Sequence, residues 1–266
     1  MRLRVMEEIM ADTVLLEKID EVAVVKFNRP RSLNAVTDEL LSDFVEVLEK
    51  VKKDSEVKVV IITGEGRAFC AGADIKEQLS PRDFKEYYEH SKLMQNITRA
   101  IVGLGKPTIA AVKGYALGEG MEFSLNCDIR ILAEGTKVGF PESRVGATVT
   151  NGGTYYLPRI VGLGRAKEMI LTAELIDDQE AYRIGYANKV VPLDKLDEEA
   201  LNMAKKIASN YFFEVRLHRE MLEASMESTL ERTLSFESYC ACASFSAGSR
   251  KEGMEHARGK KSDPSE

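Results

Sequence analysis

Residues 105–142 read GKPTIAAVKGYALGEGMEFSLNCDIRILAEGTKVGFPE, and this stretch decides the fold. Its apolar, partly β-branched start predicts a buried strand over Thr108–Val112. A glycine-rich turn follows and opens a short helix, predicted over Gly118–Asn126, that carries Glu122. A further strand-like passage ends at a second carboxylate, Glu142. Glycines at a helix start beside two glutamates predict an anion-binding site next to paired acid and base groups.

The flanking sequence alternates apolar runs with helix-like segments. Thr37 is expected to cap a helix with an apolar face from Leu40 to Val51. Strands separated by helices predict an α/β protein with a largely parallel sheet. The other expected strands are Thr13–Ile19, Val22–Phe27, Val57–Thr63, Ile129–Ala133, Lys137–Phe140 and Lys189–Val191. The other expected helices run from a Ser80 cap through Pro81 to about Val102, then over Thr154–Val161, Arg165–Thr172, Asp178–Ile184, Lys195–Ala208 and Phe213 to about His256.

The composition is that of an ordinary water-soluble protein. The 266 residues are 44% hydrophobic and 30% charged, with a formal net charge of −6 and no long basic block. This acidic balance argues against nucleic acid or an acidic membrane surface as the main partner. No stretch approaches the roughly 20 apolar residues of a membrane span. Acidic residues interrupt the first 12 positions, so no secretory signal is expected and a cytoplasmic location is predicted.

The cysteines and histidines predict no metal site. The four cysteines are Cys70, Cys127, Cys240 and Cys242, and no two of them have C-x-x-C spacing. They are expected to be small core residues in a reducing cytosol. The three histidines show no H-E-x-x-H or related spacing.

Two turns that follow buried strands are expected to converge. One is FCAGADIK at 69–76, and the other is GYALGEGMEF at 114–123. Backbone N–H groups from both turns lie outside the carboxyl ends of strands, where together they could hold one carbonyl oxygen. That arrangement suits a thioester whose oxygen becomes an enolate. The alternative is that the glycines serve only tight packing. The chain contains no G-x-S-x-G elbow, no phosphate loop of the G-x-x-x-x-G-K-[ST] type and no complete G-x-G-x-x-G.

In combination, these motifs resemble the enoyl-CoA hydratase/isomerase (crotonase) superfamily. The resemblance rests on NRPRSLNAV at 28–36, AFCAGADIKE at 68–77, the stretch from 105 to 123, CDIRI at 127–131, FPE at 140–142 and the segment LPRIVGLGRAKEMILTAELIDDQEAYRIGYANKVV at 157–191. It implies a crotonase spiral of ββα units over 13–200, after an N-terminal extension at 1–12. It also implies a C-terminal helical region at 201–266 that forms a homotrimer, or a hexamer built as a dimer of trimers.

The same resemblance implies roles for individual residues. The backbone N–H groups of Ala73 and Glu119 would form an oxyanion hole. Glu122 would activate water for attack at Cβ, and Glu142 would deliver a proton to Cα. An acyl-CoA would be the substrate, with no cofactor beyond its coenzyme A. The adenine and pantetheine of coenzyme A would pass residues of the motifs at 28–36 and 68–77, with Lys76 placed to meet phosphate: Arg31, Leu33, Ala35, Ala71, Asp74, Ile75 and Lys76.

Retention of both glutamates favours a hydratase, because water adds across a double bond and each proton movement needs a positioned partner. Other reactions of the superfamily stay open, namely double-bond isomerisation and the hydration, hydrolysis or cleavage of a cyclic or aromatic acyl-CoA. A binding or scaffolding protein, including one that binds RNA, is the alternative from another class. The acidic balance and the two glutamates argue against it.

Glu119 departs from the family, in which glycine is common at this position. A charge about 5 Å from a developing enolate would cost roughly 3 kcal/mol at an effective dielectric of about 20. Its side chain is therefore expected to point away, to be neutral or to serve the substrate. Tyr155 and Tyr156 also stand where many hydratases have polar and basic residues, which leaves the choice of acyl group open.

Overall fold

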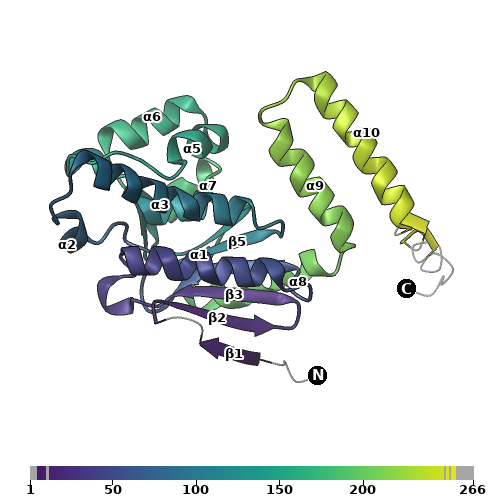
Figure 1. Cartoon of the computed structure of the whole chain (residues 1–266), viewed down its shortest axis with the longest axis horizontal. Coiled ribbons are helices and arrows are strands. Elements are labelled where there is room, and N and C mark those ends of the chain that lie inside the picture. The colour runs from purple at the N-terminus through teal and green to yellow at the C-terminus, as the bar shows by residue number, and fades with distance from the viewer. Residues whose placement is uncertain (1–4, 10–11, 249, 252, 256–266) are drawn as a thin grey trace. The chain divides into compact units, whose positions relative to one another are not determined.

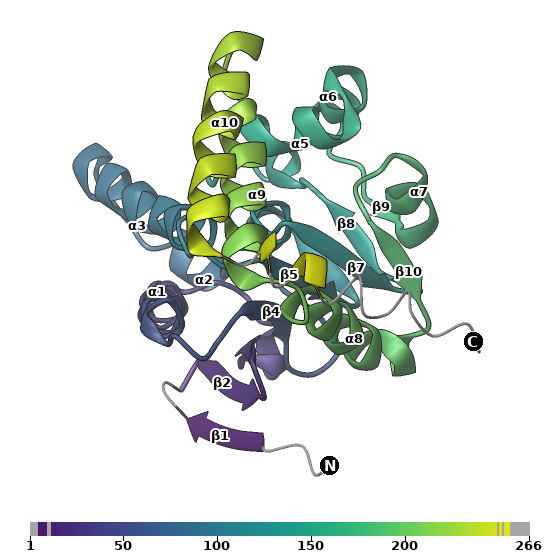
Figure 2. The ribbon, with the colours of Figure 1, turned by 90° about the vertical axis from the view of Figure 1, so that its right-hand side faces the viewer.

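A seven-stranded sheet is the largest sheet of the first of two units. This computed structural model describes residues 5–9, 12–248, 250–251 and 253–255. The units are Met1–Lys206 and Ile207–Glu266. The sheet has the order β1-β2-β3-β4-β5-β7-β10, and its strands from β3 onward are parallel. Their bounds are Val5–Ile9 (β1), Val14–Ile19 (β2), Val22–Phe27 (β3), Val59–Gly64 (β4), Thr108–Val112 (β5), Ile129–Ala133 (β7) and Lys189–Val191 (β10). Figure 2 shows the succession from β2 to β10.

Helices cover this sheet. Helices α1 (Asp38–Lys53) and α3 (Phe84–Val102) pack side by side in front of the strands in Figure 1. Helix α1 begins as expected, because the Thr37 hydroxyl accepts a hydrogen bond from the Leu40 N–H at 3.2 Å. The remaining helices of this unit are α2 (Ile75–Gln78), α4 (Glu119–Leu125), α5 (Gly153–Val161), α6 (Leu163–Thr172), α7 (Asp178–Arg183) and α8 (Leu196–Ala208, which ends just past the boundary), with short 3₁₀ turns at Pro30–Ser32 (η1), Glu142–Arg144 (η2) and Leu193–Lys195 (η3).

A second layer of short pairings lies beside the large sheet. Strands β6 (Tyr115–Leu117), β8 (Lys137–Gly139) and β9 (Ile176–Asp177) form a three-stranded sheet. Single bridges extend it, Val36 to Ala73 and Cys70 to Ala116. Successive turns of the chain thus add one long strand to the first layer and one short segment to the second. This repetition is the ββα spiral that the sequence predicts, and it sets the segment after Cys70 beside the segment after Ala116.

Aromatic packing fixes both segments to the core. The Phe27 ring lies 4.9 Å from Phe44, 5.5 Å from Phe69 and 5.8 Å from Phe123, measured between ring centroids. All four side chains are fully buried. Such aromatic pairs contribute about 0.5–1.5 kcal/mol each beyond their buried area. Because Phe69 precedes one glycine turn and Phe123 lies on α4, one cluster positions both.

Two sequence predictions about helix ends were wrong. Helix α3 starts at Phe84 rather than after Ser80, because Asp83 forms a capping box: its carboxylate accepts from the Glu86 N–H, and the Glu86 carboxylate accepts from the Asp83 N–H. The helical run expected from Phe213 to about His256 is broken into α9 (Phe212–Ser225) and α10 (Leu230–Ala247). Position 256 lies outside the described residues.

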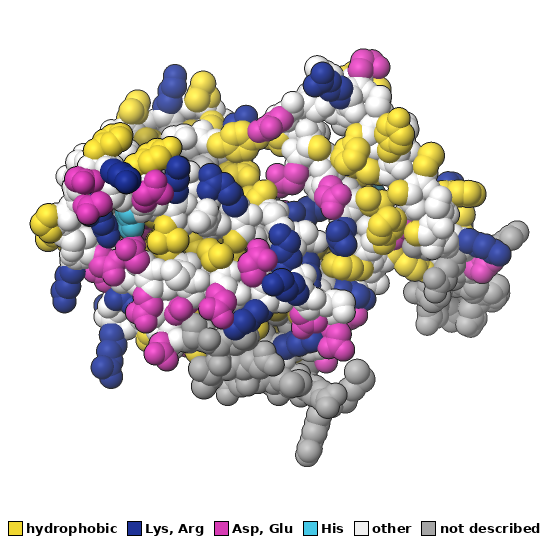
Figure 3. All heavy atoms as spheres, viewed as in Figure 1, with side chains coloured by type: hydrophobic (Ala, Val, Ile, Leu, Met, Phe, Trp, Pro, Cys, Tyr) yellow, Lys and Arg dark blue, Asp and Glu magenta, His cyan; other side chains and the backbone are white. Residues whose placement is uncertain are grey.

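The second unit is an antiparallel pair of helices, α9 and α10, which contact each other along their length in Figure 1. Thr229 caps α10 by accepting from the Arg232 N–H, which explains the restart of the helix after the break. Figure 3 shows hydrophobic side chains gathered on the surface of this pair. The most exposed of them are Leu222, Leu230, Tyr239 and Phe245, each at least 70% exposed.

Candidate active site

The segments around Ala73 and Glu119 lie close together, and the backbone N–H groups of these two residues make no hydrogen bond to another described residue. Val36 donates to the Gly72 carbonyl at 2.9 Å and accepts from the Asp74 N–H at 2.8 Å. In such a parallel bridge the intervening residue, Ala73, turns its own N–H away from Val36. Glu119 is the first residue of α4, so its N–H has no acceptor within the helix. Neither N–H donates to another described residue.

Glycine permits this close approach. Gly72 has φ +91°, and a Cβ added there would lie 2.8 Å from the Leu117 carbonyl oxygen and 3.9 Å from the Glu119 nitrogen. A Cβ on Gly120 would overlap the Cys70 carbonyl. Both turns therefore pack backbone against backbone, so these glycines serve tight packing, and their part in binding a carbonyl oxygen stays a prediction.

Glu122 is held rigidly and fully buried on α4. Its Oε1 atom accepts hydrogen bonds from the Asn151 N–H at 2.6 Å and from the Gly153 N–H at 3.0 Å. Its Oε2 atom has no hydrogen-bond partner among the described residues. Burial raises the pKa of Glu122 to about 7, although the Gly153 and Asn151 hydrogen bonds act in the opposite direction. One oxygen is thus fixed, and the other is free to exchange a proton near neutral pH.

Glu142 approaches the same helix from η2. Gly118 is the residue before α4, and a Cβ added there would lie 2.9 Å from the Oε1 atom of Glu142. The Gly118 N–H also donates to the Gly139 carbonyl at 2.9 Å, which ties the segment leading to Glu142 onto the start of α4. The Oε2 atom of Glu142 is buried and has no hydrogen-bond partner among the described residues. Burial raises the pKa of Glu142. The charge of Glu142 in turn raises the pKa of Glu122, so the two carboxyls lie within electrostatic reach.

A third carboxyl, Glu119, belongs to the same group. Its residue is 7% exposed, and its Oε2 atom has no partner among the described residues. Burial raises the pKa of Glu119 to about 8, followed by the charges of Glu122 and Glu142. The two glutamates of α4, Glu119 and Glu122, thus both have a raised pKa.

The residues expected along coenzyme A come from two segments that the structure brings together. The Ala71 N–H donates to the Leu33 carbonyl at 3.0 Å. Asp74 accepts from Arg29 Nη2 at 3.1 Å and from the Lys76 N–H at 3.0 Å, so its carboxylate is engaged within the protein. Arg31, Lys76 and Ile75 are exposed, and Ala35 is half-buried. Ile75, at 74% exposed, is an apolar side chain left open beside the turn of Ala73.

Several supporting residues were missed by the sequence reasoning. The buried Asn34 amide donates to three carbonyls, those of Glu65, Ala68 and Phe69. Arg29 donates to the Ala35 carbonyl as well as to Asp74. Both residues lie in the motif NRPRSLNAV. Polar residues that lie next to a predicted loop were the signal in the sequence that could have indicated their supporting role. The amides that hold Glu122 had no such signal, because backbone donors leave no mark on residue type.

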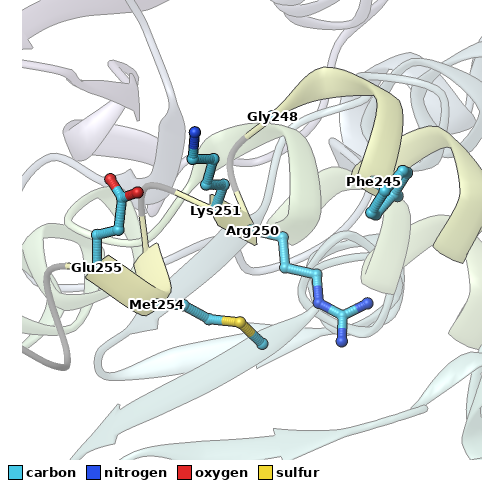
Figure 4. A pocket seen from close by; sticks show the side chains of 6 residues that line it. All are labelled: Phe245, Gly248, Arg250, Lys251, Met254 and Glu255. Atoms are coloured by element: carbon cyan, nitrogen blue, oxygen red, sulfur yellow. The ribbon is translucent and has the colours of Figure 1, made fainter.

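Other features of the described residues involve none of the predicted site residues. Figure 4 shows a hollow near the end of α10 that contains none of the predicted site residues. It is lined by Phe245, Gly248, Arg250, Lys251, Met254 and Glu255. Within the described part of the chain, no cluster of three or more His, Cys, Asp or Glu has the arrangement of a metal site. No helix there has the length and apolar character needed to cross a membrane.

Comparisons with known proteins show which family this chain resembles in sequence. The family model described as enoyl-CoA hydratase/isomerase matches residues 17–263. A short-chain-enoyl-CoA hydratase of Clostridium acetobutylicum is 41% identical over 91% of this chain and 93% of its own length. A crotonyl-CoA hydratase of Syntrophomonas wolfei is 39% identical over 91% of this chain and 94% of its own length.

Solved structures with a similar fold carry the same family description. An enoyl-CoA hydratase structure from Bacillus anthracis superposes with a TM-score of 0.90 at 34% identity, covering 93% of this chain and 96% of that one. A Geobacillus kaustophilus structure of the same description gives a TM-score of 0.91 at 27% identity, covering 97% of both chains. The family model spans most of the chain and these relatives align along nearly its whole length. The chain therefore belongs to the enoyl-CoA hydratase/isomerase (crotonase) family.

Proposed function

We propose that this protein is an enoyl-CoA hydratase, which adds water across the 2,3 double bond of an enoyl-CoA thioester. The observation that carries the proposal is the grouping of Glu122 and Glu142, each with a buried, unpartnered Oε2 atom, beside the two free N–H groups of Ala73 and Glu119. The relatives at about 40% identity are named short-chain-enoyl-CoA hydratase and crotonyl-CoA hydratase. A short enoyl chain is accordingly the first substrate to test.

In the proposed mechanism, the thioester oxygen accepts hydrogen bonds from the N–H groups of Ala73 and Glu119. These donors are in place before the reaction, so they stabilise the enolate without further reorganisation. Glu122, held through Oε1, takes a proton from water through Oε2 while the water oxygen bonds to Cβ. Glu142 then gives its proton to Cα, and the double bond becomes a single bond. A pKa of Glu122 of about 7 suits a base that works near neutral pH.

Coenzyme A is proposed to lie along Arg31, Leu33, Ala35, Ala71, Asp74, Ile75 and Lys76. The hydrogen bonds between residues 33–36 and 71–74 support this proposal, because they join the two segments directly beside Ala73. Arg31 and Lys76 are exposed cations suited to phosphate. The reaction needs no cofactor beyond the coenzyme A of the substrate.

The test is hydration of crotonyl-CoA in water labelled with ¹⁸O. We expect 3-hydroxybutyryl-CoA with the label on its Cβ hydroxyl, detected by mass spectrometry. An isomerase acting on a 3-enoyl-CoA would move the double bond without incorporating label. No turnover across a panel of linear, cyclic and aromatic enoyl-CoA esters would reject the proposal in favour of a binding protein.

We also propose a homotrimer, or a hexamer made of two trimers. The exposed apolar side chains of the α9–α10 pair support it, because apolar patches of this kind on a soluble protein are usually covered by a partner. Analytical ultracentrifugation is expected to give three or six times the mass of the chain. A monomer at micromolar concentration would contradict the proposal.

A cytoplasmic location is proposed on the chemistry of the thiols. The four cysteines form no disulfide among the described residues. Cys70, Cys127 and Cys240 are buried as expected, but the expectation of a core position was wrong for Cys242, which is exposed. Free thiols are typical of reducing compartments.

A further inference from the structure

The Glu119 side chain is the one ionisable group of the site that the hydratase mechanism does not use. Its backbone N–H serves the oxyanion hole, but its carboxyl has no assigned task. The residue is 7% exposed, no described residue bonds to its Oε2 atom, and no described Lys, Arg or His forms an ion pair with it. A buried carboxylate without a cationic partner is strongly disfavoured relative to the neutral acid.

Neighbouring carboxyls on several elements also favour the neutral form of Glu119. The strongest charged influences on Glu119 are four carboxyls: Glu122 on α4, Glu142 on η2, Asp38 on α1 and Glu77 on α2. Cys70, in the adjoining segment, is fully buried, and its thiol has a pKa raised to about 12, so it adds no charge near neutral pH.

Three basic side chains of these segments, Arg29, Arg82 and His90, are engaged with other carboxylates. Arg82 Nη2 lies 3.4 Å from Asp38 and His90 Nδ1 lies 2.9 Å from it. Burial lowers the pKa of His90, so this imidazole is a weak source of positive charge. Arg29 is bonded to Asp74 at 3.1 Å. No neighbouring cation therefore compensates a charge on Glu119.

We propose that the Glu119 side chain is a proton-controlled gate on the hydratase reaction: the site turns over rapidly while this carboxyl is neutral, and its ionisation places a charge beside the enolate and slows catalysis. The proposal rests on the hydratase function above. The carboxyl is joined through its own backbone to an N–H of the oxyanion hole, so it lies within a side chain's length of the developing negative charge. Its burial and its four carboxyl neighbours favour the neutral acid.

The sign and size of the effect follow from electrostatics. Below the pKa of Glu119, about 8, the carboxyl carries a proton and no charge, and above it the carboxylate repels the enolate. At a separation of about 6 Å and an effective dielectric of about 20, the repulsion slows the step on the order of 100-fold. Glu122 must lose a proton to act as base, so the rate rises through about pH 7 and falls again above about pH 8.

The experiment is kcat for crotonyl-CoA hydration between pH 6 and 10, measured for the unmodified enzyme, E119Q and E119G. The unmodified enzyme is expected to lose about 100-fold of its rate on the alkaline side. Both variants remove the ionisable group of Glu119 and keep the backbone N–H, so each should lose at least about 10-fold less of its rate on the alkaline side than the unmodified enzyme, and the loss that remains is assigned to ionisation of the proton donor Glu142. E134Q, which changes an exposed glutamate on the turn after β7, should retain the alkaline loss.

A second measurement does not depend on turnover. Infrared spectra of the unliganded enzyme at pH 7 should contain the carbonyl band of a protonated carboxylic acid, which disappears on titration through about pH 8 and is weaker in E119Q. An alkaline loss in E119Q equal to that of the unmodified enzyme would overturn the proposal, as would an identical acid band in both proteins. Failure of the enzyme to hydrate any enoyl-CoA would instead refute the proposed function and leave the infrared result standing.

Discussion

Glu122→Gln is expected to lower kcat for crotonyl-CoA hydration by about 10²–10⁴-fold, the usual contribution of a positioned general base. Glutamine has nearly the shape of glutamate, and its carbonyl oxygen can still accept from the Asn151 and Gly153 N–H groups. The amide nitrogen then replaces the free Oε2 atom, so the group that would take the proton from water is lost. The 150–153 turn should stay in place, and KM should change much less than kcat.

Glu142→Gln is expected to cause a loss of similar size, because the proton for Cα then has no donor. The double variant should be little slower than either single variant, since the two groups act in one reaction. Glu134→Gln is the matched control, because this glutamate is exposed on the turn after β7 and has no assigned role in the reaction. Hydration rates within about 3-fold of the unmodified enzyme for both single variants would contradict the assigned roles.

The long strands could be predicted from the sequence because their residues are buried on both faces of the sheet. All six residues of β4 are buried, and all five of β5, so each appears in the sequence as an unbroken apolar run. The expected strand over Val57–Thr63 overlaps β4 with a shift of one or two residues. The expected strand over Thr108–Val112 coincides with β5.

The second layer could not be predicted in the same way. Its pairings are two or three residues long, or single bridges such as Val36 to Ala73, which are too short to show a periodic pattern. The start of α3 was misplaced for a related reason. Ser80-Pro81 has the residue types of a helix start, but the Asp83–Glu86 capping box satisfies two backbone donors at once and prevails.

The site was predictable in its parts but not in its electrostatics. Glu122 and Glu142 stand inside motifs that the sequence carries openly, and the structure brings both to the N-terminal turn of α4. The consequence of Glu119 depends on burial and on carboxyls from α1, α2 and η2, which lie far apart in the sequence. Among the expectations for Glu119, namely a neutral carboxyl, one that points away and one that serves the substrate, this arrangement supports the neutral carboxyl on which the proposed gate rests.

Gly72→Ala is expected to remove most hydratase activity through the backbone alone. Gly72 has φ +91°, and its added Cβ would lie 2.8 Å from the Leu117 carbonyl oxygen, a backbone atom that cannot rotate aside. The two segments must then separate, which spoils the convergence of the Ala73 and Glu119 N–H groups. Loss of one oxyanion-hole donor typically lowers kcat by about 10²–10³-fold, so a fall of at least about 100-fold is expected.

Gly105→Ala is the matched control, because it separates the loss of stability caused by a positive φ from the loss of activity caused by disruption of the oxyanion hole. Gly105 has φ +72°, close to that of Gly72, but no atom lies within 4 Å of the added Cβ. Both variants should lose about 1–2 kcal/mol of unfolding free energy in urea from the left-handed conformation, and Gly72→Ala should lose more because of its clash. Only Gly72→Ala should lose activity at temperatures where both remain folded. If the two variants were equally active, the contact between the two turns would not be what holds the oxyanion donors together.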